Sequence, residues 1–436
     1  MSFFLFLAVT AALFARPGEI VPELEGLPIY EWLILACLAA SAFSASEQLS
    51  PQTLAAQPLN LAVLGTLAAI FLSHASHGDL WSARYGALDF LKVVIYYVLL
   101  VANVDTPARL RLFLLTLLGC IGGAAVLAVL QFHGMIDIAS LSAVHETLVD
   151  QAAGEELVIS RICSTGIYHD PNDLAMILVV GMMLAAYRFF DPGAAISKPF
   201  LLGAAALFFY ALLLTKSRGG LLALLAALGA LFQARFGWKK ALLLGVPILP
   251  VVAILVGGRQ AGMGSALEEG TGQSRIQLWS AGLSMFKQSP LFGFGYNRYA
   301  EEAGQVAHNS YLHAFAELGF FGGAMFLGAF FYALASLYRL GQGERRFDDP
   351  ELSRLRVYLL AALAGYSASM LSLSRTEVVP TYLMLGLAAA YLRVARTTPA
   401  LDDLALSGKL IKQTALVSVA FVAATYVFVR TFARWG

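Results

Sequence analysis

Long apolar segments alternate with polar connections along the whole chain. Each segment has roughly 17–25 residues, and a helix of that length crosses the ~30 Å hydrocarbon core of a membrane. The strand-like alternation over about ten residues that a membrane barrel needs is missing. The pattern therefore predicts an all-α polytopic membrane protein with about 12 transmembrane helices, possibly 13 if the last segment, 412–429, also crosses. The twelve candidate spans are 2–15, 29–46, 58–75, 86–104, 110–132, 172–190, 199–215, 219–234, 241–256, 314–338, 357–373 and 377–394.

Composition supports the same fold class. Of the 436 residues, 59% are hydrophobic and only 13% are charged, and the mean hydropathy is +0.72. These values lie far outside the range of soluble domains. The net charge of +1 says little about partners by itself. We expect membrane lipids around the chain and no nucleic acid as a partner.

Basic residues in alternate connections predict the orientation. Arg109 and Arg111, then Lys239 and Lys240, lie in connections on one side, which the positive-inside rule makes cytoplasmic. The N-terminus is then cytoplasmic as well. The first apolar run, up to Ala15, follows no Lys or Arg and has no clear cleavage site, so we interpret it as a retained span.

The longest polar interval, 257–312, falls on the outer side in this orientation. Ser274 is predicted to cap a helix that begins at Arg275 and ends before Ser289-Pro290, with Ile276 and Trp279 on its apolar face. Such an amphipathic helix lies on the membrane surface or closes over a cavity. Arg275 would then sit at a helix N-terminus, where its donors and free backbone N–H groups could face an oxyanion.

Several other basic residues lie on this outer side, where orientation preference disfavours positive charge. A single arginine near a span end often snorkels to the lipid headgroups, but several converging near one side suggest an anion site. Lys216 and Arg218 are the sharpest case, because they fill a very short turn between two apolar segments. The complete set is Arg161, Lys216, Arg218, Arg275, Arg298 and Arg375.

His308 precedes an apolar run that starts near Tyr311, which places it at the outer mouth of a span. A neutral imidazole near pH 7 is suited to taking a proton from a sugar hydroxyl or orienting it. Taken alone, such a histidine is more often an ordinary interfacial residue. Asn309 and Tyr311 are the neighbouring candidates for substrate binding. Elsewhere, Asp170 or Asn172 is predicted to cap the helix that follows, with Pro171 in its first turn.

Divalent-metal chemistry is poorly supported, because no Asp-x-Asp pair lies on the outer side. The chain also lacks a Walker loop, a Gly-x-Ser-x-Gly elbow and a His-Glu-x-x-His pair. We therefore expect neither a metal nor a cofactor. Positive side chains would then have to stabilise a phosphate leaving group.

Five motifs together resemble the O-antigen ligase family and the related O-antigen polymerases, over about residues 160–330. They are Asp170-Pro171-Asn172, Lys216-Ser217-Arg218-Gly219-Gly220, Ser274-Arg275 with Trp279, Gly293-Phe294-Gly295, and His308-Asn309 followed by Glu317-Leu318-Gly319.

The resemblance implies a GT-C-type glycosyltransferase of the bacterial inner membrane. It would move a glycan from undecaprenyl diphosphate to a hydroxyl of lipid A-core on the periplasmic face. Arg218 and Arg275 match the arginines that hold the diphosphate, and His308 matches the histidine at the acceptor hydroxyl. Charge placement adds Arg161, Lys216, Arg298 and Arg375 as further substrate-binding candidates.

We expect three regions: N-terminal spans with the first periplasmic loop (1–160), a ligase core that includes loop 257–312 (161–340), and C-terminal spans with cytoplasmic connections (341–436). An O-antigen polymerase, a protein O-oligosaccharyltransferase or an exopolysaccharide ligase would use the same donor with another acceptor. A flippase or transporter of lipid-linked sugars is an alternative of another class, for which Lys92 and Tyr96-Tyr97 are the conspicuous mid-span residues.

Overall fold

The computed structural model describes residues 1–149, 156–245, 264–343, 345–400 and 404–433. Within this part of the chain, eight helices are long and apolar enough to cross a membrane, or nine if one bent pair counts as a single span. The protein is therefore a multi-pass helical membrane protein, as predicted. The α-helices are α1 (Ser2–Ala15), α2 (Pro17–Ile20), α3 (Ile29–Ala40), α4 (Ala42–Gln48), α5 (Pro51–Ala56), α6 (Pro58–Ala75), α7 (Leu80–Asn103), α8 (Pro107–Phe132), α9 (Pro171–Phe189), α10 (Lys198–Leu214), α11 (Arg218–Phe236), α12 (Trp238–Gly245), α14 (Gly264–Gln288), α15 (Tyr299–Ala303), α16 (Ser310–Arg339), α17 (Pro350–Ser369), α18 (Val379–Val394) and α19 (Gly408–Phe432).

Short elements occupy the connections. The 3-10 helices are η1 (Pro22–Leu24), η2 (Ala139–Leu141), η3 (Gly166–His169) and η4 (Pro192–Ser197), and the strands are β1 (Val144–Val149), β2 (Glu156–Arg161), β3 (Arg346–Phe347) and β4 (Thr397–Thr398). Strands β1 and β2 form an antiparallel hairpin that projects from the helices, and β3 pairs with β4. The sequence interpretation expected no strands, and missed this hairpin because its strands are only six residues long.

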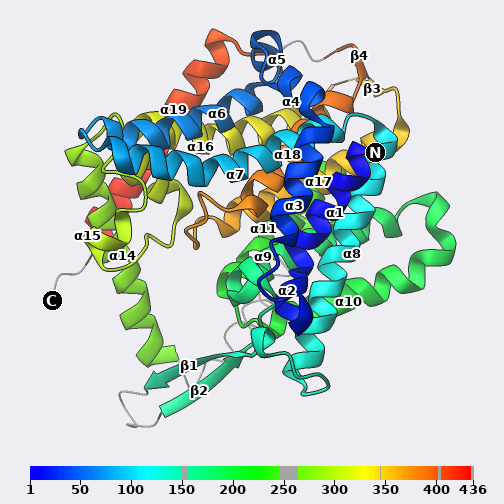
Figure 1. Ribbon diagram of the computed structural model, residues 1–436, viewed down its shortest axis with the longest axis horizontal. Coiled ribbons are helices and arrows are strands. Elements are labelled where there is room, and N and C mark those ends of the chain that lie inside the picture. The colour runs from blue at the N-terminus through cyan, green and yellow to red at the C-terminus, as the bar shows by residue number, and fades with distance from the viewer. Residues whose placement is uncertain (150–155, 246–263, 344, 401–403, 434–436) are drawn as a thin grey trace.

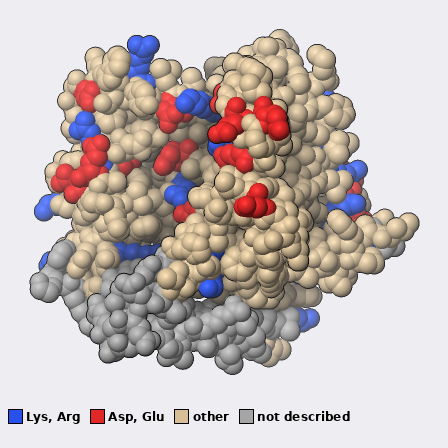
Figure 2. Space-filling view, turned by 60° about the horizontal axis from the view of Figure 1, so that its bottom comes forward, with Lys and Arg blue, Asp and Glu red and all other residues tan. Residues whose placement is uncertain are grey.

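Helices pack in two main directions (Figure 1). α6 packs against both α7 and α16 across one half of the molecule, whereas α1, α3 and α8 run steeply beside the N-terminus. On the face shown in Figure 2, charged side chains form separate groups on a largely uncharged surface, which suits a protein surrounded by lipid.

The count of twelve spans stays a prediction. Expected spans 199–215, 357–373 and 377–394 are helices α10, α17 and α18, but none of these is in the long apolar set. Most of expected span 241–256 lies outside the described residues.

The expected span 29–46 is not one continuous helix. It breaks at Ser41, where α3 and α4 are bent by 79°. The Ser41 hydroxyl donates to Asn103 Oδ1 (3.3 Å) and accepts from Asn103 Nδ2 (3.0 Å), so the break is held by a partner on α7. Nothing in the local apolar pattern marks a contact to a residue 62 positions away.

Helix α16 is interrupted at Gly319, whose φ of 66° and ψ of −167° are not helical. The preceding loop supplies hydrogen-bond acceptors for the backbone at this interruption. The N–H of Phe320 donates to the Pro290 carbonyl (2.7 Å), and that of Phe321 donates to the Leu291 carbonyl (3.1 Å). A Cβ on Gly319 would overlap the Leu291 carbonyl, so only glycine fits.

The same loop closes the other side of the break. The N–H groups of Phe294 and Gly295 donate to the carbonyls of Ala316 (3.0 Å) and Glu317 (3.1 Å). Gly293 has a φ of 87°, and a Cβ there would overlap the Glu317 carbonyl. The Gly293-Phe294-Gly295 motif thus serves to join loop 290–295 to a broken membrane helix.

Four helix N-termini meet at one end of the bundle. They belong to α9, α11, α16 and α18, which begin at Pro171, Arg218, Ser310 and Val379. The hydrogen bonds described below connect them through loop 370–378. Because free N–H groups give each helix start a partial positive charge, this end of the bundle favours anions.

Candidate functional site

Asn172, in the first turn of α9, ties two of these helix starts together. Its Oδ1 accepts from Ser217 Oγ (2.8 Å) and from Arg161 Nη2 (2.9 Å). Ser217 is the N-cap of α11 and accepts from the Gly220 N–H (3.0 Å), while Arg161 Nε also donates to the Thr215 carbonyl (2.9 Å). The turn that carries Lys216 and Arg218 is therefore fixed against α9.

Arg375 connects the starts of the other two helices, α16 and α18, to α9. Its Nε donates to both carboxylate oxygens of Asp173 (2.8 Å each), and its Nη2 lies 2.7 Å from Asp173 and 3.0 Å from Asp170. Its backbone N–H donates to Ser310 Oγ (2.9 Å) at the start of α16, and its carbonyl accepts from Thr381 Oγ1 (2.8 Å) in α18. Burial alone would lower the pKa of Arg375, but the hydrogen bond and charge of Asp173 raise it overall.

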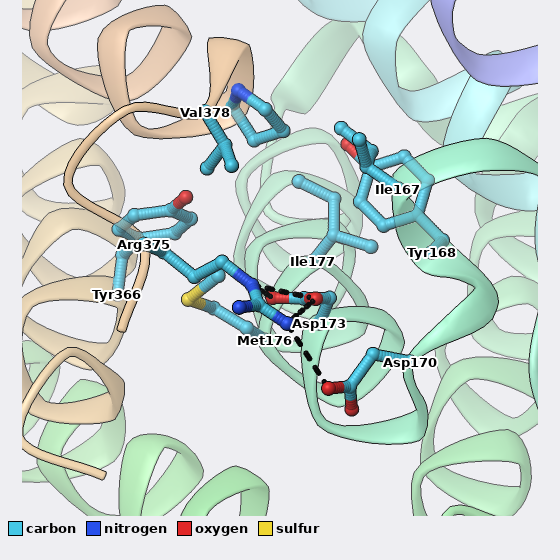
Figure 3. A pocket seen from close by; sticks show the side chains of 10 residues that line it. Ile167, Tyr168, Asp170, Asp173, Met176, Ile177, Tyr366, Arg375 and Val378 are labelled. Carbon is cyan, nitrogen blue, oxygen red and sulfur yellow. Dashed lines mark hydrogen bonds and ion pairs between the residues drawn. The ribbon is translucent and has the colours of Figure 1, made fainter. Parts of the chain in front are cut away.

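A cavity of about 170 Å³ adjoins this ion-paired group (Figure 3). Arg375 and the two aspartates form its charged part, and Tyr168 and Tyr366 lie across it from one another. The remaining walls are Ile167, Met176, Ile177, Val378 and Pro380. A cavity of about 150 Å³ lined by apolar side chains holds a benzene molecule, so this one has room for a small apolar group.

His308 lies just before α16 with a φ of 50°. The left-handed conformation costs a residue with a Cβ about 1–2 kcal/mol, so the surroundings must hold it there. Asn309 caps α16 by accepting the Leu312 N–H (3.2 Å), and Ser310 donates its N–H to the Met370 carbonyl (2.8 Å). The two residues that follow His308 are thus held in place, Asn309 by its side chain and Ser310 by its backbone.

His308 lies among positive charges. Burial lowers its pKa first, followed by the charges of Arg275 and Arg375; His313 also lowers it and Asp170 raises it. Burial also lowers the pKa of Arg275, and the charge of Arg218 lowers it further. Arg275 therefore lies within electrostatic reach of both Arg218 and His308, although the three residues come from α14, α11 and the start of α16.

Arg218 and Arg275 differ from the other predicted arginines in their partners. Across the described residues, neither forms a salt bridge with a carboxylate. Arg218 is exposed and Arg275 is half-buried. Two neighbouring guanidinium groups without a carboxylate between them leave room for an anionic ligand.

The predicted start of the helix at Arg275 is wrong. Helix α14 runs from Gly264 to Gln288, so Ser274 and Arg275 lie in its interior and no free backbone N–H group accompanies the guanidinium. Ser274 is a common cap residue, but the preceding residues continue the helix upstream. The predicted end, before Ser289-Pro290, is confirmed.

Two other predicted residues lie in different surroundings. Arg298 pairs with Asp79 in the α6–α7 connection (3.1 Å). Tyr311 is 3% exposed, and its hydroxyl is 2.6 Å from Ser367 Oγ. Arg298 thus has a carboxylate partner of its own, and Tyr311 belongs to the packing of α16 against α17.

Asp173 and Ser310 were missed from the sequence, although both hold Arg375. A carboxylate three residues after a predicted cap gives no sign of its buried partner 202 positions later. The predicted cap itself is confirmed: Asp170 accepts the Asn172 N–H (2.7 Å), with Pro171 in the first turn of α9.

The mid-span residues that a transporter would use, Lys92, Tyr96 and Tyr97, each have a partner within the protein. Lys92 is exposed and pairs with Asp89 on the same helix (2.8 Å). The hydroxyls of Tyr96 and Tyr97 bond to Thr10 (3.0 Å) and Asn60 (2.8 Å). Within the described ranges, no group of three His, Cys, Asp or Glu side chains is placed to bind a metal ion.

Residues 203–327 match the family described as O-antigen ligase. The matched segment runs from α10 into α16 and contains Arg218, Arg275 and His308. Arg161 and Arg375 lie outside it. No curated protein matches the chain.

Proposed function

We propose that this member of the O-antigen ligase family transfers a glycan from undecaprenyl diphosphate to a hydroxyl of lipid A-core at the periplasmic face of the bacterial inner membrane. The observation that carries the proposal is the position of Arg275, which lies within electrostatic reach of both Arg218 and His308, while neither arginine has a carboxylate partner among the described residues. Two forked guanidinium groups are well suited to a diphosphate.

The reaction is a displacement at the anomeric carbon. The acceptor oxygen forms a bond to that carbon, the bond to the phosphate oxygen breaks, and undecaprenyl diphosphate leaves with the electron pair. His308 takes the proton of the acceptor hydroxyl. Because its pKa is lowered, the imidazole is neutral and able to accept a proton near pH 7.

Arg218 and Arg275 stabilise the charge that develops on the departing phosphate, helped by the helix start that carries Arg218. The cavity beside Arg375 is mostly apolar and lies at the same end of the bundle. We assign it to the first part of the polyprenyl chain. The reaction then needs no soluble cofactor or metal, and the fold is of the GT-C type.

The proposal is tested with purified protein in nanodiscs, an undecaprenyl-diphosphate-linked glycan and lipid A-core. Arg218→Ala and Arg275→Ala should each lower the transfer rate by about 10²–10³, the effect of losing one donor that stabilises developing charge. His308→Ala should lower it by about 10²–10⁴, the effect of losing a general base. Arg235→Ala is the matched control, because Arg235 is on the same helix as Arg218 but roughly 25 Å away. Unchanged transfer by the His308 variant would remove it from the mechanism.

The acceptor decides between this reaction and its relatives. Transfer to a second lipid-linked repeat would indicate a polymerase, and transfer to pilin would indicate a protein O-oligosaccharyltransferase. Movement of the lipid-linked glycan across the bilayer without release of free undecaprenyl diphosphate would indicate a transporter.

A further inference from the structure

Trp279 connects the helix that carries Arg275 to the peptide that carries His308. Its indole Nε1–H donates to the carbonyl of Ala307 (2.9 Å). Trp279 is half-buried and Ala307 is fully buried. The hydrogen bond therefore lies inside the protein, where it is stronger than one that competes with water.

This bond constrains His308 directly. The Ala307 carbonyl and the His308 N–H belong to one planar peptide unit, so fixing the carbonyl fixes the plane from which the φ of His308 is measured. Asn309 fixes the following residue as the cap of α16. His308 is held at a φ of 50° from both sides.

The same bond also orients Arg275. Residues four apart on a helix share a face, so Trp279 and Arg275 lie one turn apart on the side of α14 that faces the start of α16. The indole ring also contacts Phe428 of α19, with ring centroids 5.6 Å apart. α14 contacts both α16 and α19.

We propose that Trp279 is a positioning residue that sets the geometry between Arg275 and His308 through its bond to the Ala307 carbonyl. The proposal rests on the proposed function, in which Arg275 binds the donor diphosphate and His308 accepts the proton. Trp279 touches neither substrate. It fixes the separation between the group that binds the leaving phosphate and the group that activates the incoming hydroxyl.

The first test measures the titration of His308, which needs no substrate. Groups that face His308 are Arg275 on α14, Arg375 in loop 370–378, Asp170 at the start of α9 and His313 on α16. In Trp279→Phe an aromatic ring remains, smaller than the indole, and the N–H is lost, so Arg275 moves away and the pKa of His308 should rise, as it should in Arg275→Ala. Histidine-selective ¹³C labelling in nanodiscs gives the titration, with the signal assigned by its loss in His308→Gln.

The second test is a double-mutant cycle on the same signal. In the Arg275→Ala background, Trp279→Phe should shift the pKa of His308 no further, because the charge that it displaces is already absent. Phe428→Leu is the matched control: it removes the ring that packs on the indole but leaves the N–H and its acceptor. That variant should leave the pKa of His308 close to the wild-type value.

The third test is kinetic. Trp279→Phe should lower kcat by about 10- to 10²-fold, the effect of misplacing a reacting group by about 1 Å, with the KM of the acceptor, which Arg275 does not bind, changed by less than about twofold. An equal loss of kcat in Phe428→Leu, or a His308 titration unaltered by Trp279→Phe, would overturn the proposal. If the wild-type protein transfers to no acceptor, the proposed function fails, and the titration still decides the inference.

Discussion

Replacing Arg375 by Met should destabilise the protein strongly, because it leaves the carboxylate of Asp173 without its partner. The Asp173 side chain is only 8% exposed and accepts both hydrogen bonds of the guanidinium edge. Removing one partner of a buried ion pair costs about 3–5 kcal/mol. The reverse change, Asp173→Asn, should cost less, because Arg375 is 25% exposed and keeps Asp170.

The two changes together should restore most of the lost stability. The Met–Asn pair leaves no buried charge uncompensated, and the remaining cost is that of a buried amide without a partner, about 1–3 kcal/mol. The measurement is the free energy of unfolding in mixed detergent micelles for the two single variants and the double variant, with Arg235→Ala as a control that removes an arginine elsewhere. Equal losses for Arg375→Met and Asp173→Asn, or a double variant as unstable as the sum of both, would refute this reasoning.

Three further predictions follow from the backbone and the charges of the site. Gly293→Ala should reduce the folded fraction in size-exclusion chromatography, because the left-handed conformation alone costs about 1–3 kcal/mol and the new methyl group overlaps the Glu317 carbonyl; normal folding would contradict the tight joint. Asn309→Ala should cost about 1 kcal/mol through the lost cap of α16, and Asn309→Asp should cost less, which thermal melting of the two variants compares. Because the pKa of His308 in the substrate-free protein lies below its ordinary value of about 6.5, the imidazole stays neutral as the pH falls through 6.5, so kcat/KM, which reports the free enzyme, should decline only at lower pH; an acid limb of kcat/KM at or above 6.5 would argue against His308 as the base.

Local rules predicted the elements that depend on neighbouring residues. Asp170-Pro171 gave the start of α9, and Ser289-Pro290 gave the end of α14, because cap chemistry and the missing proline N–H act within a few residues. The start of α14 was wrong because Ser274 has the chemistry of a cap but lies inside a continuous helix. A residue's preference for a helix end does not decide whether the chain before it is also helical.

The candidate site likewise contains some residues that the local sequence identified and others whose role only the fold reveals. Charge on the predicted outer side selected Arg218 and Arg275, and Arg275 lies within electrostatic reach of both Arg218 and His308. The same criterion also selected Arg298, whose partner Asp79 is 219 residues away in sequence. An arginine that pairs with a distant carboxylate and one that awaits a ligand have the same local sequence signal, so only the folded arrangement separates them.

The joint between loop 290–295 and the break in α16 makes the chain from Pro290 to Phe321 a closed unit, since its two ends are hydrogen-bonded to each other. Changes of length inside this unit therefore do not alter the spacing between α14 and the distal half of α16. Gly304 and Gln305 lie inside it and are exposed, so an epitope inserted there extends the unit outwards. An insertion between Trp279 and Pro290 instead shifts the face of α14 that carries Arg275 relative to Pro290, whose carbonyl is bonded to α16. The protein therefore has one segment that accepts added length and, next to it, one that does not.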